Sequence, residues 1–250
     1  MEIMGERTMI SKELLLEAAK RKGLTNKEHI EKDYYQDLFL FHIYKQTNLL
    51  VFKGGTALYK FYQLPRFSED LDFSVLQQSD IKAILFLTVE KIPHAKISEV
   101  KEMRESILCK IRCPGIITAG NTIRIDISTD NPVLSKFEVK NYIPPYIDIN
   151  PFAARVMNIQ EIIAEKIHAL LARQKSRDVY DLFFILRFTT LDKELVLRKL
   201  NHFGMKFDIV FIQKRIQNLA PVWKAELGVF ILGELPDFEV VRDFVVEKLS

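Results

Sequence analysis

The spacing of hydrophobic and polar residues divides the chain into a mixed first part and a helical second part. Leu71, Phe73 and Val75 alternate with polar residues, and the isoleucines of Thr122–Thr129 do the same. A period of two is typical of a strand with one polar face. Further short apolar or alternating runs predict four more strands, the last of them at an edge: Leu49–Phe52, Lys96–Val100, Ser106–Ile111 and Phe137–Tyr142.

Helices in the first part are indicated by their end signals. Ser11 is a capping residue for a first helix, and Gly23 is a natural residue to end it. Thr25 and Glu28 form a capping box for a second helix that runs to Gln46. Helical spacing predicts two more, at Thr56–Tyr62 and Ile81–Lys91.

From about Asn150 onward the pattern is helical. Asn158 and Glu161 make another capping box, before a stripe of apolar residues that predicts an amphipathic helix. Ser176 is a capping residue for the next helix. The same reasoning predicts further helices at Lys193–His202, Asp208–Leu219 and Asp237–Lys248.

These elements predict an α+β fold with two domains. We expect a mixed sheet flanked by helices at residues 1–149, followed by a C-terminal helical bundle at 150–250. The chain has 250 residues, of which 48% are hydrophobic, enough for a sizeable core.

Composition narrows the function classes. The net charge is only +3, which argues against a broad basic footprint for duplex nucleic acid. The two cysteines, Cys109 and Cys113, lack the partners of a zinc site and are expected to be reduced and buried. Residues 1–7 do not resemble a signal peptide, and no apolar run is long enough to span a bilayer. We therefore expect a cytoplasmic protein.

The candidate chemistry is concentrated between residues 53 and 73. Gly54 and Gly55 stand where a strand passes into a helix, and Thr56 follows them. Bare backbone amides at a helix start bind phosphate, although many such turns use glycine only for its backbone freedom.

Two acids follow the glycines. Asp70 and Asp72 lie two residues apart in a strand, so their side chains share a face. This spacing alone is also typical of an ordinary solvent-facing strand edge. The nearby glycines, together with Asp126 on another strand, favour a metal site instead, because converging carboxylates hold divalent cations. Phosphate and metal binding within one segment indicate chemistry on a nucleoside triphosphate.

The helical part adds charged residues. Lys166 lies within the apolar stripe, where a lysine either extends its amine to solvent or is held in a cleft for phosphate. Asp181 lies four residues after Arg177, so an ordinary helix-surface ion pair is the simpler interpretation.

Four segments together resemble the AbiEii/AbiGii nucleotidyltransferase toxins of the DNA-polymerase-beta-like superfamily. The most specific is Lys53–Leu58 followed by Arg66–Phe73. The others are Ile30–Tyr34, Ile163–Ala169, which is similar to the family's lysine motif, and Arg177–Leu182, which is similar to its last acidic motif. The resemblance spans residues 25 to 190, and it implies that the sheet domain expected at residues 1–149 is nucleotidyltransferase-like.

The resemblance implies roles residue by residue. Asp70 and Asp72 would ligate magnesium, and Asp126 would be the third carboxylate, which helps to deprotonate the attacking hydroxyl. Lys166 would neutralise phosphate charge, and Asp181 would orient it. The triphosphate would be held by residues of the first motif: Gly54, Gly55, Thr56, Arg66 and Ser68.

The implied activity is transfer of a nucleoside monophosphate from an NTP to an acceptor hydroxyl. It would use two Mg²⁺ ions, with Mn²⁺ as an alternative, and release pyrophosphate. GTP or CTP would be the donor, and RNA such as tRNA, or a protein, the acceptor. The biological setting would be the toxin of a type IV toxin–antitoxin or phage-defence pair, whose antitoxin need not bind it stably.

Two other functions remain open. A metal-dependent nuclease or phosphodiesterase could use the same acids to activate water, but needs no triphosphate cradle. A non-catalytic module that binds NTP is the third hypothesis.

Overall fold

The computed structural model describes residues 9–250, which form two compact units. The sheet unit comprises residues up to 52, 69–132 and 139–156, and the helical unit comprises 53–68, 133–138 and 157–250. The sequence predicted one boundary, between 149 and 150. That division stays a prediction; in the structure, the segment after the first strand packs within the helical unit.

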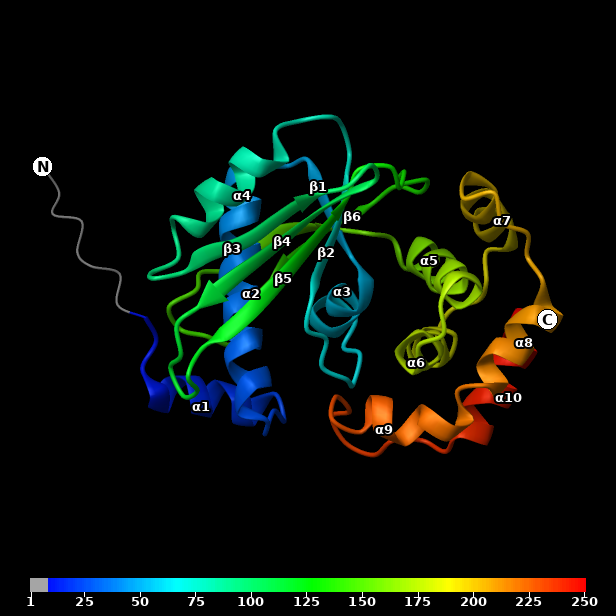
Figure 1. The fold of residues 1–250 in the computed structure, drawn as a ribbon. Helices are drawn as coiled ribbons and strands as arrows, with labels where there is room; N and C mark the ends of the chain where they lie inside the picture. Colours follow the sequence, from blue (N-terminus) through cyan, green and yellow to red (C-terminus); the bar gives the residue numbers. More distant parts are fainter. Residues whose placement is uncertain (1–8) are drawn as a thin grey trace, which may run out of the picture. The chain divides into compact units, whose positions relative to one another are not determined.

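Within residues 9–250 the strands form one seven-stranded mixed sheet in the order β3-β4-β5-β2-β1-β7-β6 (Figure 1). β2 runs parallel to β5 and β1 parallel to β7, whereas β4 is antiparallel to β3 and β5. The strands are β1 Leu50–Lys53, β2 Leu71–Val75, β3 Lys96–Glu102, β4 Ser106–Cys113, β5 Asn121–Ser128, β6 Glu138–Tyr142 and β7 Phe152–Val156. The expected α+β fold is confirmed, and β6 is an edge strand as predicted.

One face of this sheet is covered by α2 (Lys27–Gln46), with α4 (Ile81–Val89) beside it (Figure 1). α1 (Lys12–Arg21) packs against α2. Gly23 follows its C-cap residue, Lys22, and has the positive φ of 70° expected of a residue that terminates a helix. The isoleucines of β5 are fully buried, while the polar residues that alternate with them remain partly or well exposed. The polar face of β5 is therefore the face that α2 does not cover.

Buried polar residues of α2 fix the loops of the sheet unit. Asp33 accepts hydrogen bonds from Tyr146 Oη and Lys22 Nζ, each at 2.6 Å. Gln36 Nε2 donates to the carbonyl of Glu69 at 2.9 Å, and Lys32 Nζ lies 2.5 Å from the carboxylate of Glu69. α2 thus holds the residue that immediately precedes Asp70.

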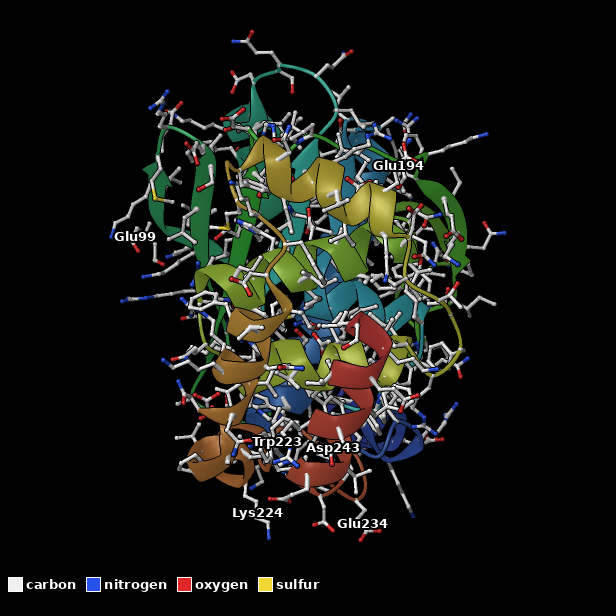
Figure 2. All side chains as sticks on the ribbon, turned by 90° about the vertical axis from the view of Figure 1, so that its right-hand side faces the viewer. Glu99, Glu194, Trp223, Lys224, Glu234 and Asp243 are labelled. Carbon is white, nitrogen blue, oxygen red and sulfur yellow. The ribbon has the colours of Figure 1, made fainter. Side chains whose placement is uncertain are left out.

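The helical unit is built around α5 (Ile159–Ala172), which packs against α6 (Ser176–Ile185), α7 (Lys193–His202) and α8 (Ile209–Gln217). α10 (Phe238–Leu249) packs against α6 and α8, and Figure 2 shows Asp243 on α10. Trp223 opens the short α9 (Trp223–Leu227) and is buried, as expected of a core residue. α3 (Gly54–Phe61) also belongs to this unit.

Several local predictions were wrong. Asn26, not Thr25, caps α2, because its side chain accepts from the amides of Glu28 and His29. Ser176 is the first residue of α6 rather than its cap. Asn158 caps α5, but Glu161 is turned elsewhere instead of completing a capping box. The strand β7 and the helix α9 were not predicted.

Both cysteines are free and buried in β4, and burial raises the pKa of the Cys109 thiol to about 11 and that of Cys113 to about 12. Among residues 9–250, no helix combines the length and the apolar character that a membrane span requires. The signal-peptide prediction concerns residues 1–7, which lie outside the described residues.

Candidate active site

Two of the predicted carboxylates lie side by side on the face of the sheet that α2 does not cover, and the third lies close by in the sequence. β2 and β5 are in parallel register, with Leu71 opposite Ile125 and Asp72 opposite Asp126. Asp72 and Asp126 therefore project from neighbouring strands on the same face. Asp70 lies two residues before Asp72, at the entrance to β2, and all three acids are partly exposed. The sequence placed Asp126 on this face correctly.

An arginine accompanies these acids. Arg124 lies two residues before Asp126 on β5, and its Nη2 donates to Asp126 Oδ2 at 2.9 Å. Burial opposes the charge of Arg124, but the hydrogen bond to Asp126 and the charges of Asp70, Asp126 and Asp72 raise its pKa. The four side chains form one electrostatic cluster, and sequence reasoning assigned Arg124 no role.

The carboxylates suit a divalent cation in their chemistry. Mg²⁺ is commonly held by one or two carboxylates together with substrate phosphates, and carboxylate oxygens are the hard ligands it prefers. Over the described part of the chain, no group of three or more His, Cys, Asp or Glu residues is arranged to hold a metal by itself. Asp70 and Asp72 therefore suit a cation that is also coordinated by the phosphates of a bound substrate. They do not form a complete set of protein ligands by themselves.

The glycines begin α3 in the helical unit. Gly54 has a φ of +73°, a conformation that L-residues other than glycine rarely adopt. A Cβ on Gly55 would lie 2.6 Å from Arg66 Nη2 and 2.8 Å from Ser68 Oγ. Gly55 thus allows Arg66 and Ser68 to approach the backbone of the first helical turn, in which Thr56 is also buried.

Arg66 is held firmly from two directions. Its backbone bridges to Ile231, and the neighbouring Phe67 amide donates to the carbonyl of Phe230 at 2.7 Å. Its guanidinium makes a bidentate pair with Asp181, with Nε and Nη2 at 2.9 and 2.8 Å from the two carboxylate oxygens. Such fork-to-fork pairing is specific to arginine.

Asp181 also forms an ion pair with Lys166, whose Nζ lies 2.6 Å from Asp181 Oδ2. Lys166 reaches Asp178 as well, at 2.9 Å, and all three residues are buried. Burial opposes the charge of Lys166, but Asp181 and Asp178 outweigh it and raise the pKa of this lysine. Lys166 therefore stays protonated inside the helical unit.

Arg173 closes this cluster at its exposed end. Its Nε donates to Asp178 Oδ2 at 3.0 Å, while half of its side chain remains exposed. Burial would raise the pKa of Asp178, but Lys166 and Arg173 hold it well below its usual range. This cluster contains three cations and two carboxylates, so it has one positive charge in excess. Its members are Arg66, Lys166, Arg173, Asp178 and Asp181.

A second buried ion cluster was not foreseen. Glu165 lies 3.2 Å from Lys53 Nζ and 3.3 Å from Lys199 Nζ, and Lys199 also pairs with Glu161 at 2.8 Å. Lys53 immediately precedes Gly54, so this cluster anchors the start of α3. The sequence could have pointed to Glu165, because this residue belongs to the lysine motif Ile163–Ala169. No pattern in the sequence points to the distant Lys199.

The predicted residues are therefore distributed over two sets. The sheet unit brings together Asp70, Asp72 and Asp126. The helical unit brings together Gly55, Arg66 and Ser68 around α3, and joins Arg66 to Lys166 through Asp181. Ser68 and Asp70 are separated by one residue in the sequence.

The chain thus combines a mixed sheet that carries paired aspartates with a helix that begins at two glycines. Solved structures share this fold. MenT4, a nucleotidyltransferase toxin of Mycobacterium tuberculosis, is 19% identical and superposes with a TM-score of 0.63, covering 94% of this chain and 88% of its own. JHP933 of Helicobacter pylori is 21% identical with a TM-score of 0.55, covering 90% and 94%.

The family model described as nucleotidyl transferase AbiEii toxin, type IV TA system, matches residues 38–243. The chain belongs to this family, as its motifs predicted, and is a nucleotidyltransferase of the toxin–antitoxin class. A search of the curated proteins finds no significant match.

Proposed function

We propose that the protein transfers a nucleoside monophosphate from an NTP to an acceptor hydroxyl, with magnesium as the cofactor. The observation that carries this proposal is the register of β2 and β5, which sets Asp72 beside Asp126 two residues after Asp70. The shared fold and family support the reaction class.

The reaction balances without a further reactant. The acceptor oxygen bonds to the α-phosphorus, the bond from that phosphorus to the β-phosphate oxygen breaks, and pyrophosphate leaves. The hydroxyl proton passes to a base, a role we give to Asp126. Bound magnesium would offset the charge of the phosphates and lower the pKa of the acceptor hydroxyl.

The chain's own residues bind and orient the substrate. Asp70 and Asp72 would hold the cation, and the amides of Gly55 and Thr56 at the start of α3 would bind phosphate oxygens. The ion pairs with Asp181 hold Arg66 and Lys166 in fixed positions. Their single excess positive charge, shared with Arg173, favours an anionic ligand.

We further propose GTP or CTP as donor and RNA such as tRNA, or a protein, as acceptor. The setting would be a toxin–antitoxin or phage-defence pair in the cytoplasm, with an antitoxin that need not form a stable complex. The family description supports the toxin–antitoxin setting.

The first test incubates the purified chain with each α-labelled NTP, Mg²⁺ and total RNA or protein. Label should enter one acceptor pool, and Asp70→Asn or Asp72→Asn should reduce transfer by about a hundredfold or more, the loss expected when transition-state charge goes unstabilised. Asp130→Asn, an exposed acid just after β5, is the matched control and should retain activity.

Other outcomes contradict the proposal. RNA cleavage without any NTP would identify a nuclease. Tight NTP binding with no labelled product in any pool would identify a non-catalytic module.

A further inference from the structure

Four charged side chains interact on the face of the sheet that α2 does not cover. Asp72 lies opposite Asp126, and Arg124 lies two residues before Asp126 on β5. Asp70 lies two residues before Asp72, just outside β2, and its charge acts on Arg124. This quartet contains three acids and one arginine, so its formal charge is −2. A divalent cation carries the charge that would neutralise it.

The quartet contains an unfavourable pair. Like charges directly opposite each other on neighbouring strands are destabilising. Asp72 and Asp126 form such a pair, and both are only partly exposed. The guanidinium of Arg124 relieves this repulsion, because it lies 2.9 Å from Asp126 and its charge interacts favourably with Asp70 and Asp72.

The other neighbour of Arg124 directs it to the acids. On β4, Lys110 lies opposite Arg124, which again places like charges side by side. Lys110 reaches away to Glu99 on β3, at 2.7 Å, and Figure 2 shows Glu99 at the border of the molecule. Arg124 is therefore repelled from one side and attracted from the other.

We propose that Arg124 is a resident counter-cation that competes with the divalent ion for the carboxylates and so sets the metal affinity of the site. This inference rests on the proposed function, since it assumes that Asp70 and Asp72 bind the metal. Nearly half of the Arg124 side chain (47%) is exposed, so the guanidinium can turn to water at small cost.

This arrangement has a consequence for the order of binding. Without nucleotide, Arg124 offsets one of the three negative charges and repels a lone cation, so the cation gains less than it would from the acids alone. An NTP supplies further oxygen ligands and negative charge, which shift the balance toward the cation. We therefore expect weak metal binding by the nucleotide-free protein and tighter binding of the metal–NTP complex.

The test measures Mn²⁺ binding to the full, nucleotide-free chain by electron paramagnetic resonance. Arg124→Gln should lower the Kd for Mn²⁺ about tenfold, because a positive charge close to the ion is removed. Arg124→Lys keeps the charge and should remain within about threefold of the wild type. Lys110→Gln removes the neighbouring cation whose partner is Glu99 and should change the Kd less than Arg124→Gln does.

Unfolding temperatures give a second measurement. In metal-free buffer Arg124→Gln should unfold at a lower temperature than the wild type, because the positive charge that offsets the repulsion between Asp72 and Asp126 is removed. Added Mn²⁺ should raise its unfolding temperature more than that of the wild type. The proposal is overturned if Arg124→Gln binds Mn²⁺ no more tightly than the wild type.

The results separate this proposal from the proposed function. If metal-dependent nucleotide transfer occurs but Arg124→Gln leaves the Kd for Mn²⁺ unchanged and raises KM for NTP, Arg124 is a phosphate contact and only the counter-cation proposal fails. If neither protein binds Mn²⁺ and no transfer occurs, both proposals fail.

Discussion

Gly55 is the residue whose identity the structure explains most directly. It has no side chain because Arg66 and Ser68 occupy the space that a Cβ would fill. The sequence predicted Gly54 and Gly55 at a turn before the helix, but α3 begins at Gly54 itself. The glycines are therefore part of the first helical turn, where their amides are available to a ligand.

Gly55→Ala should therefore impair both stability and transfer. The new methyl group would force Arg66 and Ser68 to move, at a cost of about 1–3 kcal/mol for overpacking. Chemical denaturation and the labelled-nucleotide assay measure the two effects. The control is Gly23→Ala, where no atom lies within 4 Å of the new Cβ and only backbone strain is added. Equal transfer rates in both variants would contradict this assignment.

At the scale of single residues, the sequence identified the acids but not their charge partners. Asp70, Asp72 and Asp126 follow from a period of two, which is a local pattern. Arg124 also follows that pattern, two residues before Asp126, and could have been noticed. The pair between Arg66 and Asp181 joins residues 115 positions apart, and no spacing rule reveals it.

Among the elements, α5 and α6 carry the most consequential contact. Asp181 of α6 compensates two buried cations, Arg66 and Lys166, and is itself fully buried. The prediction of a surface pair with Arg177 was the simpler interpretation of the sequence, but the described contacts of Asp181 are with Arg66 and Lys166. Asp181 of α6 thus forms ion pairs that stabilise the fold of the helical unit.

Asp181→Asn should destabilise the fold by about 3–5 kcal/mol, the usual cost of leaving buried charges uncompensated. Asparagine preserves the shape, so the loss reports the missing charge. Asp243→Asn is the matched control, because Asp243 pairs with Arg242 on the exposed surface of α10 and should matter little. Urea denaturation of both variants makes the comparison, and similar losses would refute the assignment.

The elements that sequence reasoning missed are short. Phe152–Val156 has two alanines and an arginine among its five residues, so neither its alternation nor its β-propensity identifies a strand. It becomes a strand because β1 offers a parallel partner, with Phe52 opposite Val156. The long helix α2, by contrast, follows from its own residues apart from the cap.

For the whole molecule, the buried charges predict how stability depends on pH. The pKa of Asp178 is lowered in the folded state, so its ionisation stabilises the fold fully above the unfolded value near 4 and is lost as the pH falls below it. The pKa of Lys166 is raised, so its contribution persists below the unfolded value of 10.5 and is lost as the pH rises past it.

Denaturation from pH 7 down to pH 2.5 should therefore show a steep loss of stability below about pH 4. Asp178→Asn should be less stable at pH 7 and show a flatter slope below pH 4, because the group that titrates is absent. Asp243→Asn should retain more of the wild-type slope, since solvent screens that pair. Parallel slopes for the wild type and Asp178→Asn would show that the ion cluster does not control acid unfolding.

The fold class was predictable for the molecule as a whole, because alternation and helical spacing are separated along the chain. The division into units was harder to foresee. Residues 53–68 and 133–138 belong to the helical unit, although sheet-unit segments flank them in the sequence. Contacts between distant segments determine this assignment, and local composition does not reveal it.

The position of β7 has a practical consequence for anyone who would dissect this protein. β7 pairs between β1 and β6, yet it follows both of them along the chain. A fragment cut after residue 149 would lack β7, which joins β6 to β1 in the sheet. The backbone edge of β1 would then be exposed. Such a truncation should be made beyond Val156. Even then the fragment would keep residues 53–68 and 133–138, which pack with the helical unit in the whole chain.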